Sequence, residues 1–247
     1  MKFTRRETLT LAAAATAAGV AGLPSIALAK DGDVIDQLKL MAPAGIPDKV
    51  LGNPSAKVTV IEYASPTCPH CAAFSNTVLQ PFQDKYVKSG KVKFILRPFA
   101  RNTMDAAIFM LAEAAATAAA GPSAAPATDA SSEASAAPAP VAPADTSAAA
   151  TAYENVLSAY FRTQNTWGVS DKPLDAVKAV AVQLGFSDDS FNAALKNQAY
   201  FDAVQKMRDQ AVNDFGLEGT PTFYINGKSM SGEKSLDELS AEIDPLL

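Results

Sequence analysis

The chain has 247 residues, 48% of them hydrophobic and 19% charged, which favours one compact domain or two small ones over a disordered tail or a coiled coil. The formal net charge of −5 excludes nucleic acid as the main partner, because binding phosphates requires a basic surface. The chain has only two cysteines, too few for the disulfide framework of a small secreted domain.

The first 29 residues have the pattern of an export signal. Arg5 and Arg6 precede an alanine-rich apolar stretch of about 15 residues, and an Ala-Leu-Ala site follows. The stretch is short for a membrane span, so we expect cleavage near Ala29 and a mature protein in the periplasm, with an uncleaved signal anchor as the alternative. Arg5-Arg6 resembles a twin-arginine signal. General secretion stays open, because Thr8 occupies a position where such signals usually have a bulky apolar residue.

The rest of the chain divides into a lead-in, two halves of one α/β domain and a helical insertion between the halves. We expect these parts at residues 30–45, at 46–103 and 217–247, and at 104–216, respectively. After the signal, no run of about 20 residues is free of both charge and proline, so we expect a soluble mature protein.

The first half has a strand-helix-strand pattern after a turn-rich stretch with at most one short strand. Residues 57–63 are mostly apolar and β-branched, which predicts a buried strand with one unexpected charge, Glu62. A helix is predicted from Pro69 to the glycine at position 90. Residues 91–96 predict a second strand parallel to the first.

The insertion is predicted to be helical, apart from a low-complexity segment. Residues 121–147 consist almost entirely of Ala, Pro, Ser, Thr and Gly, and we interpret them as a disordered segment. Helical periodicity resumes near Tyr153 and continues to about residue 215. The second half then has a strand at 222–225, an Asn-Gly hairpin turn, a short return strand and a closing helix.

The motif Cys68-Pro69-His70-Cys71 predicts a redox site, because a thiolate at the start of a helix is stabilised by backbone N–H groups and the helix dipole. Cys68 is the expected exposed nucleophile, and His70, the only histidine in the chain, is expected to give it a hydrogen bond or a positive charge. Cys71 is the expected shielded, resolving thiol. Stabilising the thiolate makes the disulfide less stable, so we expect the site to oxidise other dithiols.

Other readings of the two cysteines compete with this one. A structural disulfide closing so short a loop would remove little unfolded-state entropy. Zinc requires four ligands, which Cys68, His70 and Cys71 cannot supply within one molecule, so we expect neither a metal nor another cofactor. Cu(I) held by two thiolates stays open, as does a bystander role for His70.

Two distant positions add to the redox hypothesis. A buried Glu62 carboxyl would have a raised pKa and could relay the proton of Cys71, although an outward-facing Glu62 at a sheet edge is the alternative. Pro221 could hold a cis bond beside the site and leave the backbone of Thr220 free to pair with an extended substrate.

The segments VIEYASPTCPHC, EGTPTFYINGK and SLDELSAEIDPLL together resemble the DsbA-like thiol:disulfide oxidoreductases of the thioredoxin superfamily. The resemblance implies a thioredoxin fold with an inserted helical subdomain. It places the nucleophile at Cys68, the resolving cysteine at Cys71, the buried acid at Glu62 and the cis-proline at Pro221, preceded by Thr220. We expect Thr220, Pro221 and Pro69 to contact substrate.

The resemblance also implies a role and partners. Members of this family introduce disulfides into reduced exported polypeptides and are reoxidised by a membrane quinone-linked partner. A disulfide isomerase or reductase of the same fold is the first alternative, and a copper-binding dithiol module without turnover is the second. Isomerases of this superfamily usually dimerise through an N-terminal domain. The lead-in is too short for one, so we expect a monomer.

Overall fold

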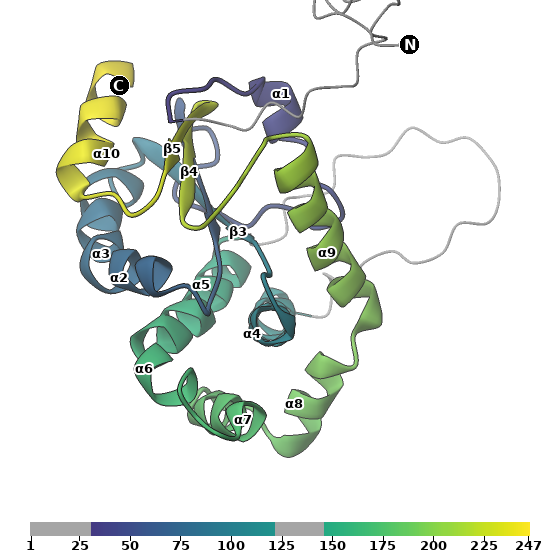
Figure 1. The fold of residues 1–247 in the computed structure, drawn as a ribbon. Helices are drawn as coiled ribbons and strands as arrows, with labels where there is room; N and C mark the ends of the chain where they lie inside the picture. Colours follow the sequence, from purple (N-terminus) through teal and green to yellow (C-terminus); the bar gives the residue numbers. More distant parts are fainter. Residues whose placement is uncertain (1–30, 122–145) are drawn as a thin grey trace, which may run out of the picture.

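The computed structural model describes residues 31–121 and 146–247 (Figure 1). The expected export signal at 1–29 and nearly all of the expected low-complexity segment at 121–147 lie outside the described residues.

A five-stranded sheet forms the centre of the described chain, with the strand order β1-β3-β2-β4-β5. The strands are β1 Val50–Leu51, β2 Val58–Ala64, β3 Val92–Pro98, β4 Thr222–Ile225 and β5 Lys228–Ser231. β2 and β3 are parallel. The other three pairs, β2 with β4, β4 with β5 and β1 with β3, are antiparallel. All seven residues of β2 are buried, in agreement with the apolar run that predicted a strand covered on both faces.

The β4–β5 hairpin turns at Asn226 and Gly227, as predicted. Both residues have positive φ values, 47° and 93°, as a two-residue hairpin of this type requires. A Cβ atom at position 227 would lie 2.5 Å from the backbone oxygen of Ile35, so the lead-in chain passes too close for a side chain there.

The predicted helix after Pro69 is divided into three segments: α2 Pro69–Thr77, α3 Leu79–Phe82 and the π-helical η2 Gln83–Val87. Pro81 explains the break between α2 and α3, because proline lacks an N–H and its ring clashes with the carbonyl four residues earlier, at Thr77. The lead-in also contains a helix that was not predicted, α1 Gln37–Leu40, with Asp36 as its N-cap.

The insertion is helical, as predicted. Its helices are α4 Thr103–Ala120, α5 Thr146–Arg162, α6 Gln164–Trp167, α7 Pro173–Gln183, α8 Asp188–Leu195 and α9 Gln198–Asn213. α4 packs against α5, α7, α8 and α9. The chain then returns to the sheet and ends with α10 Leu236–Ile243 and the 3-10 turn η3 Asp244–Leu246.

In Figure 1, α2, α3 and α10 lie on one side of the sheet and α9 on the other, with α6, α7 and α8 gathered beyond its end. Among the described helices, α4 alone is long and apolar enough to cross a membrane. Its contacts with four other helices are those of a core helix, which meets the same criterion. The domain boundaries stay predictions.

Candidate active site

The two cysteines lie at the N-terminus of α2, and both are free thiols. Cys68 is the N-cap residue, with extended backbone, and Pro69 occupies the first helical position. Only 3% of Cys68 and none of Cys71 is exposed. The burial of Cys71 agrees with the expected shielded thiol. The expectation of an exposed Cys68 is wrong, because a loop from the far end of the chain covers it.

The covering loop precedes β4 and contains the Thr220–Pro221 peptide bond, which is cis. The Cys68 Sγ lies 3.1 Å from the carbonyl oxygen of Thr220, which accepts a hydrogen bond from Cys68 when its thiol is protonated. Because β4 pairs directly with β2, the sheet fixes this loop beside the turn that leads into α2. The structure therefore brings Cys68, Thr220 and Pro221 together, as predicted from their separate motifs.

The surroundings of the two thiols shift their pKa values in opposite directions. The pKa of Cys68 is lowered to about 5, chiefly by a hydrogen bond with the Cys71 side chain, then by the Thr220 side chain and the backbone N–H groups of Cys71 and His70, which together outweigh burial. The pKa of Cys71 is raised well above its ordinary value, first by burial, then by its hydrogen bond to Cys68 and the charge of Glu62. Cys68 is thus the thiolate and Cys71 its hydrogen-bond donor.

His70 acts on Cys68 through its backbone, and its imidazole points elsewhere. The side chain is 68% exposed, and its Nδ1 lies 3.3 Å from Oε2 of Glu233, in the turn between β5 and α10. Among the described residues, the hydrogen-bond partner of the imidazole is Glu233 and not Cys68, as had been expected from the sequence. Pro69 is also exposed, so both residues between the cysteines face solvent.

Glu62 lies in the central strand, with Leu96 of β3 and Phe223 of β4 as its neighbours in register. Only 1% of it is exposed, so the alternative of an outward-facing edge residue is wrong. Its pKa is raised to about 8, first by burial, then by the negative charges of Cys68 and Glu154. Glu62 therefore holds a proton at neutral pH, within electrostatic reach of both thiols.

A buried carboxylate that was not predicted fixes the turn before Cys68. Asp105, which is fully buried near the start of α4, accepts hydrogen bonds from the Ser65 hydroxyl at 2.8 Å and the Thr67 N–H at 2.7 Å. It also accepts one from the Arg101 N–H at 2.9 Å. The sequence contains a local signal for the start of this helix, the N-cap residue Asn102. Its side chain accepts a hydrogen bond from the N–H of Asp105. The contact with the turn is long-range, and no local pattern indicates it.

A contact of Gln164, in α6, with the same turn was also not predicted from the sequence. Its side-chain amide donates to the carbonyl oxygens of Pro66, at 2.7 Å, and Cys68, at 2.9 Å. The insertion thereby holds the same turn from the other side. An adjacent pocket of about 460 Å³ is lined by Thr67 and Pro69 and by Trp167 and Val169 of the insertion. This pocket is thus bordered by the residues on either side of Cys68. Among the described residues, no three His, Cys, Asp or Glu side chains gather in a way that could hold a metal ion.

Comparison with known proteins agrees with this geometry. The family model described as Thioredoxin matches residues 46–137 and 127–245. A double cysteine-to-alanine variant of alpha-DsbA1 from Wolbachia pipientis has a similar structure, with a TM-score of 0.67 and 25% identity over 86% of this chain and 96% of that chain. DsbA of Chlamydia trachomatis shares the fold, with a TM-score of 0.59 and 17% identity over 80% of this chain and 90% of that one.

A Rickettsia felis protein, provisionally named a protein-disulfide oxidoreductase, is 24% identical over 202 residues, which are 81% of this chain and 60% of that protein. The chain thus spans about three fifths of the length of the curated relatives. It belongs to the thioredoxin family. Its fold is similar to that of DsbA proteins, and the predicted thioredoxin fold with an inserted helical subdomain is confirmed.

Proposed function

We propose that the protein oxidises dithiols of exported polypeptides in the periplasm by thiol–disulfide exchange at Cys68 and Cys71. The observation that carries this proposal is the set of hydrogen-bond donors around Cys68, which lowers the pKa of its thiol to about 5. A reduced form held as a thiolate makes the Cys68–Cys71 disulfide easier to reduce, and the protein that contains it a stronger oxidant.

The exchange begins when a substrate thiolate attacks the Cys68 sulfur of the oxidised protein. The substrate–Cys68 bond forms and the Cys68–Cys71 bond breaks, leaving the electron pair on Cys71, which takes a proton from the Glu62 carboxyl. The second substrate thiolate then attacks the substrate sulfur. The substrate disulfide forms, and Cys68 leaves as a thiolate that accepts hydrogen bonds from Cys71 and from backbone N–H groups.

The loop at Thr220–Pro221 and the exposed ring of Pro69 flank the nucleophile from two sides. We assign substrate contact to these three residues, with an extended substrate backbone pairing along Thr220. We further propose that the mature protein acts as a monomer, and that a membrane quinone-linked partner restores its disulfide. His70 contributes its backbone N–H to the thiolate and presents its imidazole at the surface that substrates meet.

The reduction potential of the Cys68–Cys71 couple tests the direction of exchange. The purified protein is equilibrated with glutathione buffers at pH 7, and the oxidised fraction is read by thiol trapping and by the fluorescence of Trp167. We expect a potential well above the value of about −270 mV for thioredoxin, toward about −120 mV. A value near that of thioredoxin would contradict the oxidase proposal and favour a reductase or isomerase. Stoichiometric Cu(I) binding without exchange would favour the binding module.

A further inference from the structure

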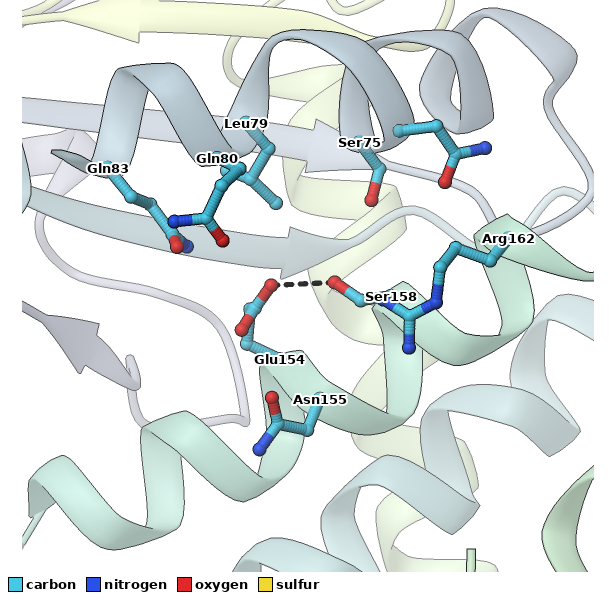
Figure 2. A pocket seen from close by; sticks show the side chains of 9 residues that line it. Ser75, Leu79, Gln80, Gln83, Glu154, Asn155, Ser158 and Arg162 are labelled. Atoms are coloured by element: carbon cyan, nitrogen blue, oxygen red, sulfur yellow. Dashed lines mark hydrogen bonds between the residues drawn. The ribbon is translucent and has the colours of Figure 1, made fainter. Parts of the chain in front are cut away.

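The start of α2 has a different neighbour from the rest of the helix. Further along, α2 and α3 face α5 across a polar pocket of about 520 Å³, which Figure 2 shows with Ser75 on one wall and Glu154 on the other. None of the residues that line this pocket belongs to the Cys-Pro-His-Cys motif. The imidazole of that motif, at His70, instead meets Glu233 in the turn between β5 and α10, with 3.3 Å between Nδ1 and Oε2. This turn therefore borders the exposed part of the motif.

The turn, residues 232–234, contacts the active site at a second point. The N–H of Gly232 donates a hydrogen bond to the carbonyl oxygen of Pro221, at 2.8 Å. Pro221 belongs to the cis peptide bond of the loop that covers Cys68. A displacement of the turn would consequently remove a donor from the covering loop and, at the same time, the partner of the imidazole.

A side chain of the lead-in holds both ends of this turn. The Asp31 Oδ1 accepts a hydrogen bond from the Ser231 N–H, and its Oδ2 lies 3.4 Å from the Nζ of Lys234. Ser231 and Lys234 stand immediately before and after Gly232 and Glu233, the two residues that contact the active site. Asp31 is thus one residue away from each of these contacts.

The lead-in reaches the turn by pairing along β5, the last strand of the sheet. The N–H groups of Gly32 and Ile35 donate to the carbonyl oxygens of Ser229 and Gly227, respectively, both at 2.9 Å. An isolated antiparallel bridge lies between them. Because the pairing is antiparallel, Asp31 comes to the end of β5 that pairs with the start of β4, beside the covering loop. The backbone pairing therefore fixes the place of the Asp31 carboxylate.

The hydrogen bond to the Ser231 N–H contributes more to this arrangement than the ion pair does. It is charge-assisted and directional, and it is the main cause of the lowered pKa of Asp31. The contact with Lys234 is longer, and 59% of the Asp31 side chain is exposed, so solvent screens the pair. An uncharged side chain that offers an oxygen at the same place should therefore replace most of the effect of Asp31.

We propose that Asp31 is a positioning residue of the active site, which fixes the turn at 232–234 and through it the Pro221 carbonyl and the His70 imidazole at the surface that meets the substrate. The inference rests on the proposed thiol–disulfide exchange for its effect on substrates, and it holds for either direction of exchange. Asp31 does not touch the reacting sulfur atoms. The expected cleavage of the export signal near Ala29 leaves Asp31 in the mature protein.

The first test uses the imidazole as a reporter of the turn. His70 is the only histidine in the chain, so its Cε1–H NMR signal is unambiguous in the purified, reduced protein. Glu233→Gln gives the displacement of this signal that follows from loss of the partner carboxylate. In Asp31→Ala we expect the signal to move in the same direction by more than about half of that displacement. Asp31→Asn, which keeps an acceptor for the Ser231 N–H, should move it by less than about a quarter.

The second test measures the consequence for substrates. The oxidation of a reduced peptide with two cysteines is followed at steady state, with oxidised glutathione regenerating the disulfide of the protein. In Asp31→Ala we expect KM to rise about fivefold, because the loop at Pro221 that contacts the peptide backbone is less well fixed. We expect kcat to stay within about twofold, because Cys68 keeps its hydrogen bonds with Cys71 and the helix N–H groups. Asp31→Asn should restore most of the original KM.

Asp36→Ala is the matched control. Asp36 also lies in the lead-in and accepts hydrogen bonds from two backbone N–H groups, those of Leu38 and Lys39, and its loss changes the net charge by the same amount. None of its hydrogen bonds among the described residues reaches the turn. The control should leave the His70 signal and KM unaltered. Circular dichroism checks that every variant is folded.

An unmoved His70 signal in folded Asp31→Ala would overturn the inference. An equal movement in Asp36→Ala would also overturn it, because a general loosening of the lead-in would then account for the change. A moved signal with an unaltered KM would overturn the role in substrate contact. The NMR signal does not depend on exchange, so failure of the oxidase proposal is read separately, from the potential of the unaltered protein.

Discussion

At Glu62, burial and neighbouring negative charge both favour the protonated form and raise the pKa to about 8. The unfolded chain ionises this group near pH 4.5, whereas the folded protein keeps the proton up to about pH 8. The folded state therefore has its full stability below about pH 4.5 and loses stability as the pH rises toward 8.

We expect Glu62→Gln to stabilise the reduced protein by about 2 kcal/mol at pH 7 and to have almost no effect at pH 4. Glutamine does not ionise, so the variant keeps the stability that the unaltered protein loses as the pH rises. Urea unfolding at pH 4, 5.5, 7 and 8 measures the difference. Glu218→Gln, at an exposed carboxylate, is the control and should change stability by less than about 0.5 kcal/mol at each pH. A constant gap between Glu62→Gln and the unaltered protein at all four values would contradict the prediction.

The side chain of Thr220 helps to lower the pKa of Cys68, and its buried hydroxyl has no other hydrogen-bond partner among the described residues. Thr220→Val keeps the shape and removes the hydroxyl. We expect the pKa of Cys68 to rise by about half a unit to one unit, and the potential to become about 15 to 30 mV more negative, because the contribution of the Thr220 side chain to the lowered pKa is removed. Thiolate absorbance at 240 nm against pH, together with the glutathione titration, measures both.

Thr222→Val is the matched control, since its hydroxyl donates to the carbonyl oxygen of Gly219 and does not contribute to the pKa of Cys68. It should leave the Cys68 titration in place. If both valine variants shifted the titration equally, a general movement of the loop would account for the change.

At the scale of elements, the turn before α2 is held to the start of α4 by the fully buried Asp105. We expect Asp105→Ala to destabilise the protein by about 3 kcal/mol, because the Ser65 hydroxyl and the Thr67 N–H lose their acceptor. Urea unfolding measures the loss. Asp189→Ala, at an exposed first-turn position of α8, should cost less than about 1 kcal/mol. Equal losses in the two variants would show that the hydrogen bonds of Asp105 add little.

The regular elements were predicted wherever one local pattern dominated. The β-branched run at 57–63 became β2, and Asn226-Gly227 became the hairpin turn. The predictions failed where two signals competed. Pro81 interrupts a helical apolar spacing, and its effect outweighs that pattern because a missing N–H and a ring clash cannot be accommodated within a straight helix. The lead-in helix α1 is only four residues long, too short to show periodicity.

The site was predictable only in part, for a related reason. Cys68, Cys71 and the Thr-Pro pair belong to compact motifs, whereas Asp105 and Gln164 reach the site by long-range packing of the insertion. A single sequence contains no local pattern for such contacts. The orientation of His70 was unpredictable too, since it depends on Glu233 in a turn 163 residues away.

For the molecule as a whole, the depressed pKa of Cys68 links stability to both redox state and pH. In the reduced protein, Cys68 ionises at about pH 5 when folded and near pH 9 when unfolded. Ionisation of Cys68 therefore stabilises the folded, reduced protein. This stabilisation is present in full above about pH 9 and is lost as the pH falls through 5. The oxidised protein has no such contribution, because both sulfurs are in the disulfide.

We therefore expect the stability of the reduced protein, relative to the oxidised protein, to rise by about 2 kcal/mol between pH 4 and pH 7, after allowance for solvent screening. Parallel denaturant titrations of the two forms measure the difference. The double variant Cys68→Ser, Cys71→Ser provides the baseline without thiols. A relative stability independent of pH would show that Cys68 is not held as a thiolate.

The nucleophile lies early in the chain and contacts a carbonyl group 152 residues further on, brought to it by the pairing of β4 with β2. The helices between them form by local contacts, whereas this pairing has to close a loop spanning most of the domain. At about 5 to 20 residues per second, Thr220 leaves the ribosome roughly 8 to 30 s after Cys68. During that interval Cys68 has neither the covering loop nor the Thr220 hydroxyl beside it. The cover over Cys68 is therefore completed only with the last strands, whereas the Cys71 side chain and the helix N–H groups that lower the pKa of Cys68 are its neighbours in the sequence.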